Sequence, residues 1–175
     1  MRLGILADTH DRIARTRSAI ELLRAAGAEA LVHCGDLASP EVVELLAVLP
    51  SWFVFGNHDA DVVPHLERAA AKWGVTCLRW GGLVTLAGKR VAVAHGHMSS
   101  DVRRLLAAEP DYLLSGHSHV ASDATAGRVR RINPGALSRA ERFTVAVLEV
   151  GGGGLELLEL PPGDGATFET PEAGG

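Results

Sequence analysis

The 175-residue sequence contains only two cysteines, Cys34 and Cys77, which lie far apart along the chain. Each lies in an apolar stretch, so we expect two buried free thiols in place of a disulfide, which favours a cytoplasmic location. The chain also lacks any apolar run of about 18 residues, the length that spans a membrane. The apolar start of the chain is interrupted by Asp8 and His10, which is not typical of a signal peptide. We therefore expect no membrane association.

An excess of positive charge is also missing. Seventeen Lys and Arg residues oppose 21 Asp and Glu residues, which gives a net charge of -4 and a pI near 6.0. This balance argues against binding nucleic acid or anionic membranes through bulk charge. The length and the 47% hydrophobic content favour one globular domain. We expect this domain to span residues 1–160, and residues 161–175, rich in proline and glycine, to form a flexible tail.

The hydrophobic pattern predicts strands that alternate with amphipathic helices in the first half of the chain. Two successive strand-helix-strand units of this kind indicate a parallel sheet with helices on its faces. A hairpin follows, so either the sheet becomes mixed or a second sheet begins. The expected strands span residues 2–7, 31–34, 51–55, 82–87, 90–95, 112–115, 128–133, 142–150 and 155–160, and the expected helices span residues 13–24, 40–49, 64–73 and 101–109.

Polar clusters follow five of the expected strands, and they contain six of the eight histidines. Ligands of open α/β sheets bind outside the carboxyl ends of the strands, so we expect these loops to line one pocket. Glycine at positions 35, 56, 96 and 116 would let the chain turn sharply there. The clusters are Asp8-Thr9-His10-Asp11, Gly35-Asp36, Gly56-Asn57-His58-Asp59, His95-Gly96-His97 and Gly116-His117-Ser118-His119.

The clusters offer carboxylates, imidazoles and one carboxamide, a set suited to divalent manganese, zinc, iron, nickel or cobalt. We expect manganese first. The candidate ligands are more numerous than the three or four that one metal needs, so the sequence predicts two ions. A shared carboxylate would hold them roughly 3.5 to 4 Å apart, a spacing suited to displacement at phosphorus. The candidates are Asp8, His10, Asp36, Asn57, His95, His117 and His119.

In order along the chain, the motifs Asp-x-His, Gly-Asp, Gly-Asn-His-Asp, His-Gly and Gly-His-x-His resemble the signature of the calcineurin-like metallophosphoesterase superfamily. The resemblance covers the chain from Asp8 to about Gly135. The small size, His95-Gly96-His97 and Ile132-Asn133-Pro134-Gly135 are similar to the YfcE-like small phosphodiesterases. The resemblance implies an α/β fold of two facing mixed β-sheets flanked by α-helices.

The resemblance also implies a role for each matching residue. His58 would contact the phosphate or protonate the leaving oxygen as a general acid, and Asp59 would orient His58. We predict a dinuclear metal-dependent phosphoesterase that hydrolyses a small phosphodiester substrate by in-line attack of a metal-bridging hydroxide. The ligands divide into Asp8, His10, Asp36 and His119 for one metal and Asp36, Asn57, His95 and His117 for the other, with Asp36 as the bridge.

Two other functions stay open for this fold. A retromer subunit that keeps the fold serves mainly as a protein-interaction scaffold, but the complete ligand set here argues against that role. A nuclease of the same superfamily would need extra regions that guide DNA, for which this short chain has no room. A small phosphate ester is therefore the expected partner, and a homo-oligomer is left open.

Other histidines and arginines have ordinary structural interpretations. His33 lies in an expected strand and is predicted to be a hydrogen-bonded core histidine. His97 is either a substrate contact or a solvated loop residue. Arg128, Arg130 and Arg131 form either a basic strip beside the pocket or a solvated strand face.

Overall fold

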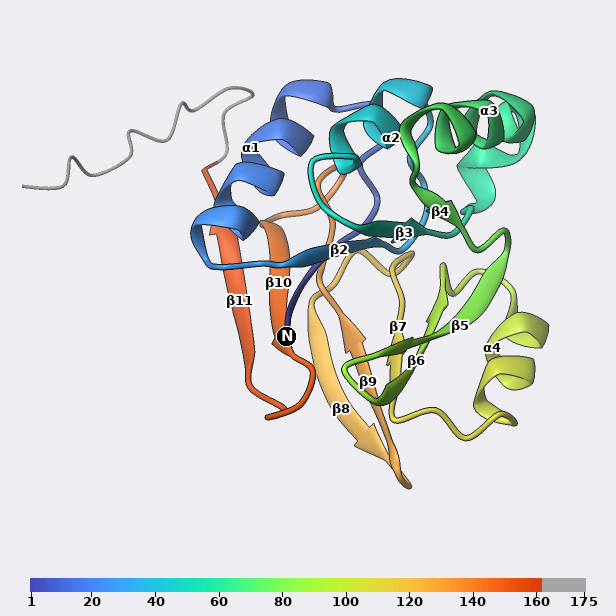
Figure 1. The fold of residues 1–175 in the computed structure, drawn as a ribbon, viewed down its shortest axis with the longest axis vertical. Coiled ribbons are helices and arrows are strands. Elements are labelled where there is room, and N and C mark those ends of the chain that lie inside the picture. Colours follow the sequence, from blue (N-terminus) through green and yellow to red (C-terminus); the bar gives the residue numbers. More distant parts are fainter. Residues whose placement is uncertain (162–175) are drawn as a thin grey trace, which may run out of the picture.

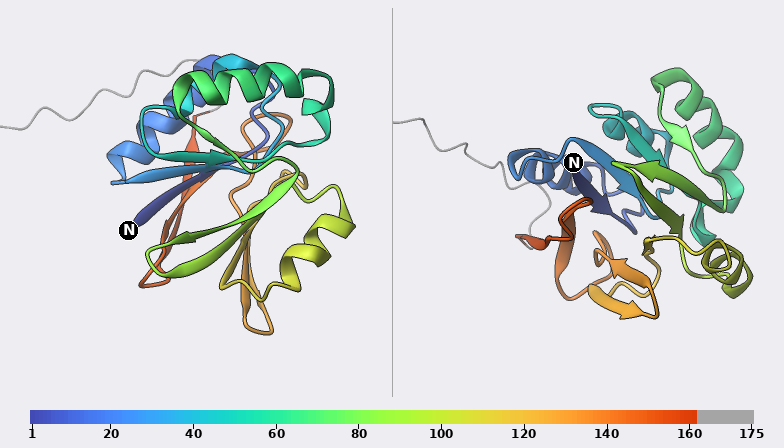
Figure 2. Two further views of the ribbon diagram at one scale, coloured as in Figure 1. Left: turned by 45° about the vertical axis from the view of Figure 1, so that its right-hand side comes forward. Right: turned by 60° about the horizontal axis from the view of Figure 1, so that its bottom comes forward.

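The computed structural model describes residues 1–161, which form four layers in the order helices, sheet, sheet, helix (Figures 1 and 2). The predicted tail, residues 161–175, lies outside the described residues except for its first one. The six-stranded sheet has the order β11 (Leu155–Leu160), β10 (Phe143–Glu149), β1 (Arg2–Leu6), β2 (Ala30–His33), β3 (Ser51–Phe53) and β4 (Thr76–Cys77). The five-stranded sheet has the order β5 (Gly81–Leu86), β6 (Lys89–Ala94), β7 (Tyr112–Leu114), β9 (Val129–Asn133) and β8 (Ser122–Ala126).

Helices cover the outer faces of both sheets. Helices α1 (Ile13–Ala25), α2 (Pro40–Leu46) and α3 (Val63–Trp73) pack on the six-stranded sheet, and α4 (Ser99–Leu106) packs on β5 and β6. A short 3-10 helix, η1 (Asn57–Val62), leads into α3. Each sheet contains both parallel and antiparallel neighbours. The fold of two facing mixed sheets flanked by helices is thereby confirmed.

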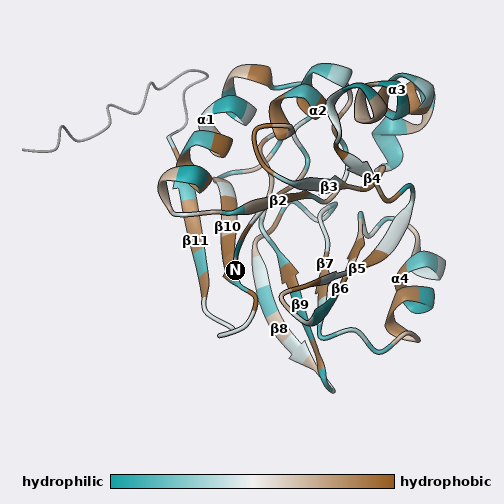
Figure 3. Ribbon diagram, in the orientation of Figure 1, coloured by the Kyte–Doolittle hydropathy of each residue, from teal (hydrophilic) through white to brown (hydrophobic). Residues whose placement is uncertain are grey.

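The side-chain alternation of β1 shows how the layers are held together. Leu3 and Ile5 point into the core between the two sheets, whereas Leu6 points into the core beneath the helices. All three are fully buried, and burial of such a side chain stabilises a fold by about 1.5 to 3 kcal/mol. The central strand β2 is coloured as hydrophobic in Figure 3, while the edge strand β8 is pale to hydrophilic.

The strand directions decide where the polar loops meet. Strands β1, β2 and β3 are parallel neighbours, so their carboxyl ends share one edge of the first sheet. Strands β6 and β7 are also parallel, so their carboxyl ends share an edge of the second sheet. Contacts described below join these two edges, and the site lies at this junction.

Two strands of the structure are not predicted by the sequence pattern. Strand β8 has the sequence Ser-Asp-Ala-Thr-Ala and all five residues are exposed, so it lacks the alternation that marks a half-buried strand. Strand β4 has only two residues, Thr76 and Cys77. Cys34 is buried, Cys77 is partly buried, and both are free thiols. No helix within residues 1–161 has the length and apolar character that crossing a membrane requires.

Candidate metal centre

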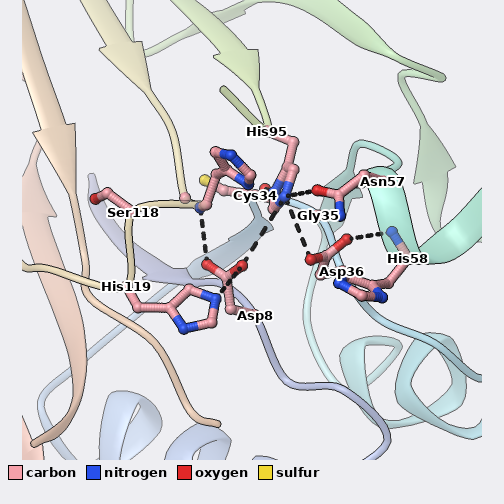
Figure 4. A network of polar contacts seen from close by, with 12 residues as sticks. Asp8, Cys34, Gly35, Asp36, Asn57, His58, His95, Ser118 and His119 are labelled. Atoms are coloured by element: carbon pink, nitrogen blue, oxygen red, sulfur yellow. Dashed lines mark hydrogen bonds and ion pairs between the residues drawn. The ribbon is translucent and has the colours of Figure 1, made fainter. Parts of the chain in front are cut away.

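Main-chain hydrogen bonds bring the loop after β1 against the loop after β2. The amide of Asp8 donates to the carbonyl of Gly35, and the amide of His10 donates to the carbonyl of Asp36, each at 3.0 Å. In the second sheet, the amide of Gly116 donates to the carbonyl of His95 at 3.0 Å. Figure 4 shows side chains from these loops pointing toward one another. The cluster is therefore built on backbone pairing that continues past the strand ends.

Asp8 is fully buried and faces the cluster with one free oxygen. Its Oδ2 accepts a hydrogen bond from the amide of His117 at 3.0 Å, which joins the two sheets. Within residues 1–161 its Oδ1 has no hydrogen-bond partner, and it lies 3.3 Å from Nε2 of His119 and 3.9 Å from Nε2 of His95. A buried carboxylate oxygen without a donor is costly in a folded protein, and a bound cation would satisfy it.

Asp36 lies between Asp8 and His58 and contacts three other residues of the cluster. Its Oδ2 is 3.5 Å from Nε2 of His10 and 3.4 Å from Nε2 of His95. Its Oδ1 accepts a hydrogen bond from the amide of His58 at 2.9 Å. This carboxylate therefore faces ligand atoms on two sides, as a shared ligand must.

Three groups of side chains within residues 1–161 each place three ligand atoms within 4.8 Å of one another. Asp8, His10 and Asp36 each belong to two of these groups, so the groups overlap. Carboxylate oxygens and imidazole nitrogens are the donors that divalent transition metals take. The groups are Asp8, His10 and His119; His10, Asp36 and His58; and Asp8, Asp36 and His95.

The hydrogen bonds of two imidazoles fix which nitrogen faces the cluster. Nδ1 of His95 donates to the carbonyl of Cys34 at 2.9 Å, and Nδ1 of His119 donates to the carbonyl of Arg139 at 3.2 Å. A carbonyl oxygen only accepts, so Nδ1 carries the proton and Nε2 of a neutral ring presents its lone pair to the cluster. This is the tautomer that a metal-ligating histidine needs.

Asn57 and His117 are less closely joined to the cluster. The side-chain Oδ1 of Asn57 lies 3.1 Å from Nε2 of His95, although Asn57 is exposed. The ring of His117 packs edge-on against that of His95, with centroids 5.0 Å apart, but it belongs to none of the three groups found in residues 1–161. The structure therefore brings together all the predicted ligands except His117, which contacts Asp8 through its main chain.

The charges of the cluster are set mainly by burial. Burial raises the pKa of Asp8 to about 6 and lowers the pKa of His10 to about 4. Burial also acts to raise the pKa of Asp36, but the hydrogen bond and charge of His95 outweigh it and the pKa is lowered to about 2. At neutral pH, Asp36 is ionised and the ring of His10 is neutral, so both are in the state that binds a metal.

The backbone is unusual at the predicted ligands. Left-handed φ angles are uncommon for residues other than glycine, and they cost roughly 1 to 2 kcal/mol per residue. Such conformations cluster at functional sites because the surrounding structure must hold them. The ligand residues with positive φ are Asp8 at 53°, His10 at 43°, Asp36 at 59°, His117 at 69° and His119 at 58°.

The glycines of the motifs serve two different purposes, only one of which was expected. Gly35 has a φ of +95°, a turn conformation that favours glycine. Gly56 and Gly116 do not have positive φ, but a Cβ there would come within 2.1 Å of Oδ1 of Asp36 and 2.6 Å of Oδ2 of Asp8. Glycine at these two positions leaves room for the carboxylates.

Asp59 makes different contacts from those the sequence suggested. Its carboxylate is fully buried and accepts hydrogen bonds from the amides of Gly56 at 2.7 Å, Asp36 at 2.9 Å and Ala38 at 2.8 Å. Within residues 1–161, no hydrogen bond joins it to the imidazole of His58. Asp59 thus fixes the loop of Asp36 against the loop of Asn57, and the orientation of His58 by Asp59 stays a prediction.

A buried hydrogen-bond chain beneath the cluster includes a residue that the sequence analysis missed. His33 is fully buried; its Nδ1 accepts from the amide of Gly35 at 3.2 Å, so its Nε2 donates to Oγ1 of Thr9 at 3.1 Å. The Thr9 hydroxyl in turn donates to the carbonyl of Asp36 at 3.3 Å. His33 is thus confirmed as a hydrogen-bonded core histidine, and the middle residue of the Asp-Thr-His motif supports the next loop.

The structure also shows the surroundings of His97 and of the arginines in and just before β9. His97 is partly buried, with its ring 5.3 Å from that of His95, so it lies at the edge of the cluster. Arg130 forms an ion pair with Asp123 at 2.7 Å and hydrogen-bonds the carbonyl of Gly153, so it stabilises the β8-β9 hairpin. Arg128 and Arg131 are exposed.

Arg139 is a second residue that the sequence analysis missed. It lies in the loop after β9, and its carbonyl holds the ring of His119. The available signal was the position of Asn133-Pro134-Gly135 at the end of another parallel strand, since β9 runs parallel to β7. The loops after β7 and β9 therefore lie at the same edge of the second sheet.

Two mixed sheets that carry carboxylates and imidazoles at their joined strand ends define a metallophosphoesterase fold. Residues 1–153 match the family model described as the calcineurin-like phosphoesterase superfamily domain. This match covers most of the chain, so the protein belongs to that superfamily and is a phosphoesterase. The family that the motifs predicted is confirmed.

Known proteins similar to this chain agree with this assignment. Phosphodiesterase MJ0936 of Methanocaldococcus jannaschii is 27% identical over 144 residues, which cover 77% of this chain and 83% of that protein. The solved structure of an archaeal phosphodiesterase has a TM-score of 0.81 and 24% identity, covering 91% of this chain and 100% of that chain. The phosphoesterase Yfce from E. coli has a TM-score of 0.66 and 21% identity, covering 90% of this chain and 98% of that chain. The two structural likenesses support the fold.

Proposed function

We propose that the chain is a phosphodiesterase that uses two divalent metal ions, most readily manganese. The observation that carries the proposal is the overlap of three ligand groups, which share Asp8, His10 and Asp36. One ion would leave several of these atoms unused, whereas two ions sharing Asp36 would use them. The orphaned Oδ1 of Asp8 and Nε2 of His10, both buried, support the same interpretation.

The protein side chains would divide the work of hydrolysis. When bound, the ions would lower the pKa of a coordinated water and draw charge from the phosphoryl oxygens. The ionised carboxylate of Asp36, with the lone pairs of His95 and His119, would hold the ions in place. Zinc, iron, nickel and cobalt suit the same ligands, so metal choice would also follow availability.

His58 is the proposed general acid because it combines exposure with closeness to the cluster. Its ring is exposed and lies 4.9 Å from the ring of His10, measured between centroids. Its amide is fixed by Oδ1 of Asp36, which sets the loop but leaves the ring facing solvent. From this position, His58 would donate a proton to the departing alkoxide, which typically contributes about 10² to 10⁴ in rate.

Phosphodiesters are the preferred substrate class for two reasons. The curated relative is named a phosphodiesterase. His58 would protonate a poor leaving alcohol, which an unactivated diester always presents. We also predict a cytoplasmic location, in keeping with the free thiols of Cys34 and Cys77.

The proposal is tested by removing metal with a chelator and restoring it with manganese. Turnover of bis-p-nitrophenyl phosphate should vanish and return, and should exceed that of p-nitrophenyl phosphate and of pyrophosphate. Full turnover in the metal-free protein would overturn the metal-dependent reaction. A preference for the monoester would overturn the substrate class alone.

A further inference from the structure

A groove begins at the metal cluster and runs away from it along the surface. Its volume is about 670 Å³, within the range of roughly 300 to 1,000 Å³ that is usual for small-molecule sites. It is bounded by the loop before β8, by the loop before β10, and by β11, elements labelled in Figure 1. His119 lines its inner end, and Nε2 of the same ring is 3.3 Å from Oδ1 of Asp8. The groove is thus continuous with the proposed reaction centre.

The floor of the groove is apolar although it faces solvent. Val120 is 65% exposed and Leu157 is 48% exposed, and Ala121 and Ala140 also line the groove. Large apolar side chains exposed together on one concave surface are a common mark of a binding site. The groove is therefore suited to a hydrocarbon or aryl group.

Arg139 supplies positive charge where the groove meets the cluster. It is exposed, and within residues 1–161 its guanidinium has no hydrogen bond or ion pair. Arg142, the other arginine of the groove, is paired with Glu159. The carbonyl of Arg139 accepts a hydrogen bond from Nδ1 of His119 at 3.2 Å, so this residue lies beside the cluster. An anion at the cluster would be stabilised on the groove side.

The loop that carries Arg139 is held firmly. The guanidinium of Arg15 donates to the carbonyl of Leu137 at 2.8 Å, and the amide of Leu137 donates to the carbonyl of Ala7 at 3.2 Å. The side chain of Asn133 donates to the carbonyl of Gly116 at 2.8 Å. The groove wall is therefore anchored to the same strand ends that carry the predicted ligands.

We propose that this groove binds the non-leaving arm of the substrate, and that the natural substrates are phosphodiesters in which that arm is an apolar alkyl or aryl group. The inference rests on the proposed function, because it takes the phosphate to lie at the metal cluster. The phosphate then lies between the cluster and Arg139, and one ester arm extends past His119 onto Val120 and Leu157. The leaving arm points toward His58.

The test compares two diesters that share one leaving group, methyl p-nitrophenyl phosphate and phenyl p-nitrophenyl phosphate. The ratio of kcat/KM, phenyl over methyl, should be high in the wild type, and Leu157→Glu or Val120→Asp should lower it by roughly 10-fold. Turnover of the methyl diester should change less than about twofold, because neither side chain touches the cluster. The two diesters differ in intrinsic reactivity, but this difference is the same for every protein because each variant is compared with the wild type on the same two substrates.

A matched control is available in the second sheet. Leu83 on β5 is 38% exposed and lies outside the groove, so Leu83→Glu adds the same charge at a similar exposure. This variant should keep the wild-type ratio. An unchanged ratio in both groove variants, or an equal loss in Leu83→Glu, would overturn the proposal.

A binding measurement separates this inference from the proposed activity. In zinc-loaded protein, diphenyl phosphate should shift the amide resonances of Ala121 and Ala140, and dimethyl phosphate should not. Such shifts without any turnover would support the groove while refuting the diesterase. Turnover without these shifts would refute the groove alone. A phenyl preference that appears only after residues 162–175 are deleted would also contradict the proposal, because part of the chain would then occupy the groove.

Discussion

The two sheets contribute different chemistry to the same site. The first sheet supplies both buried carboxylates of the cluster, Asp8 and Asp36, on loops after β1 and β2. The second sheet supplies imidazoles alone, His95, His117 and His119. The carboxylates are fixed by amide donors, as in the bond from His58 to Asp36, whereas the imidazoles are fixed by carbonyl acceptors. One sheet therefore supplies the carboxylates of the site, and the other supplies imidazoles that face them.

This difference explains why the site can be preformed. Carboxylates placed on both sheets would repel one another across the junction, but imidazole rings opposite Asp8 and Asp36 do not. Direct hydrogen bonds already join the sheets at the site, among them those from the His117 amide to Asp8 and from His95 to the Cys34 carbonyl. A bound metal would add to this junction by compensating the charge of the first sheet. Losing a carboxylate should accordingly cost more than losing an imidazole.

The largest effect is expected for Asp36→Ala. Asp36 belongs to two ligand groups, so the variant should lose both ions and nearly all turnover. Removing a residue that hydrogen-bonds a metal ligand typically lowers metal affinity roughly 10- to 100-fold. The loss of metal affinity in Asp36→Ala should be larger than this. His119→Ala is the comparison from the second sheet: His119 belongs to one group, so no more than one ion should be lost. Elemental analysis that finds two ions in Asp36→Ala would contradict the proposal that carboxylates of the first sheet matter more for metal binding than imidazoles of the second.

The next effect concerns His58, which is on a first-sheet loop but is assigned to the substrate. His58→Asn should keep both ions while turnover falls by roughly 10² to 10⁴. The fall should shrink for p-nitrophenyl esters, because nitrophenolate leaves without needing a proton. Loss of metal from this variant would make His58 a ligand, in line with its place beside His10 and Asp36. Full activity on a poor leaving group would refute the general acid.

Asp59→Asn should have a smaller effect on the same loops. The carboxylate accepts from three amides, and the NH₂ group of asparagine would face donors in their place. We expect metal affinity to fall roughly 10- to 100-fold and the free energy of unfolding to fall by about 1 to 3 kcal/mol. Calorimetric metal titration and chemical unfolding check both. If metal affinity is unchanged and kcat falls only for substrates with poor leaving groups, then Asp59 acts by orienting His58.

The effect that is smallest at neutral pH is a pH dependence of stability, which comes from His33 beneath the loops of the first sheet. Burial lowers the pKa of His33 from its ordinary 6.5 to about 3, so below pH 6.5 the unfolded chain takes up a proton that the folded chain does not. This uptake lowers the free energy of unfolding by at most about 1.4 kcal/mol per pH unit as the pH falls from 6.5 to 3.

His33→Gln should remove that contribution from the metal-free protein. Plotted against pH, the difference in unfolding free energy between wild type and variant should shrink as the solution is acidified. His65→Gln, at an exposed histidine, is the control and should follow the wild type. Parallel curves for wild type and His33→Gln would contradict a neutral buried His33.

The sequence predicts most of this architecture because its signals are local. Buried strands such as β1 and β2 are continuous apolar runs, and the polar residues that follow them mark the strand ends. Strand β8 was not predicted because all its residues are exposed. It forms through pairing with β9 and not because of its own hydrophobic pattern. The choice between one mixed sheet and two also depends on pairing, and only the resemblance to a known family indicated two.

The site shows the same division between local and long-range information. Residue types at strand ends predicted the ligands, because coordination chemistry restricts which side chains can take part. The hydrogen bonds of Asp59 could not be predicted, since they depend on where the amides of Asp36 and Ala38 lie in space. Arg139 was missed for a similar reason: its loop reaches His119 only through the pairing of β7 with β9.

The central claim is that the carboxylate edge of one sheet and the imidazole edge of the other hold two ions that are needed for diester hydrolysis. Metal-free protein can be titrated with manganese by calorimetry while turnover of bis-p-nitrophenyl phosphate is followed at each addition. We predict that turnover rises until two equivalents per chain are bound and then stays constant. A plateau at one equivalent, or full turnover before any metal is added, would contradict the account.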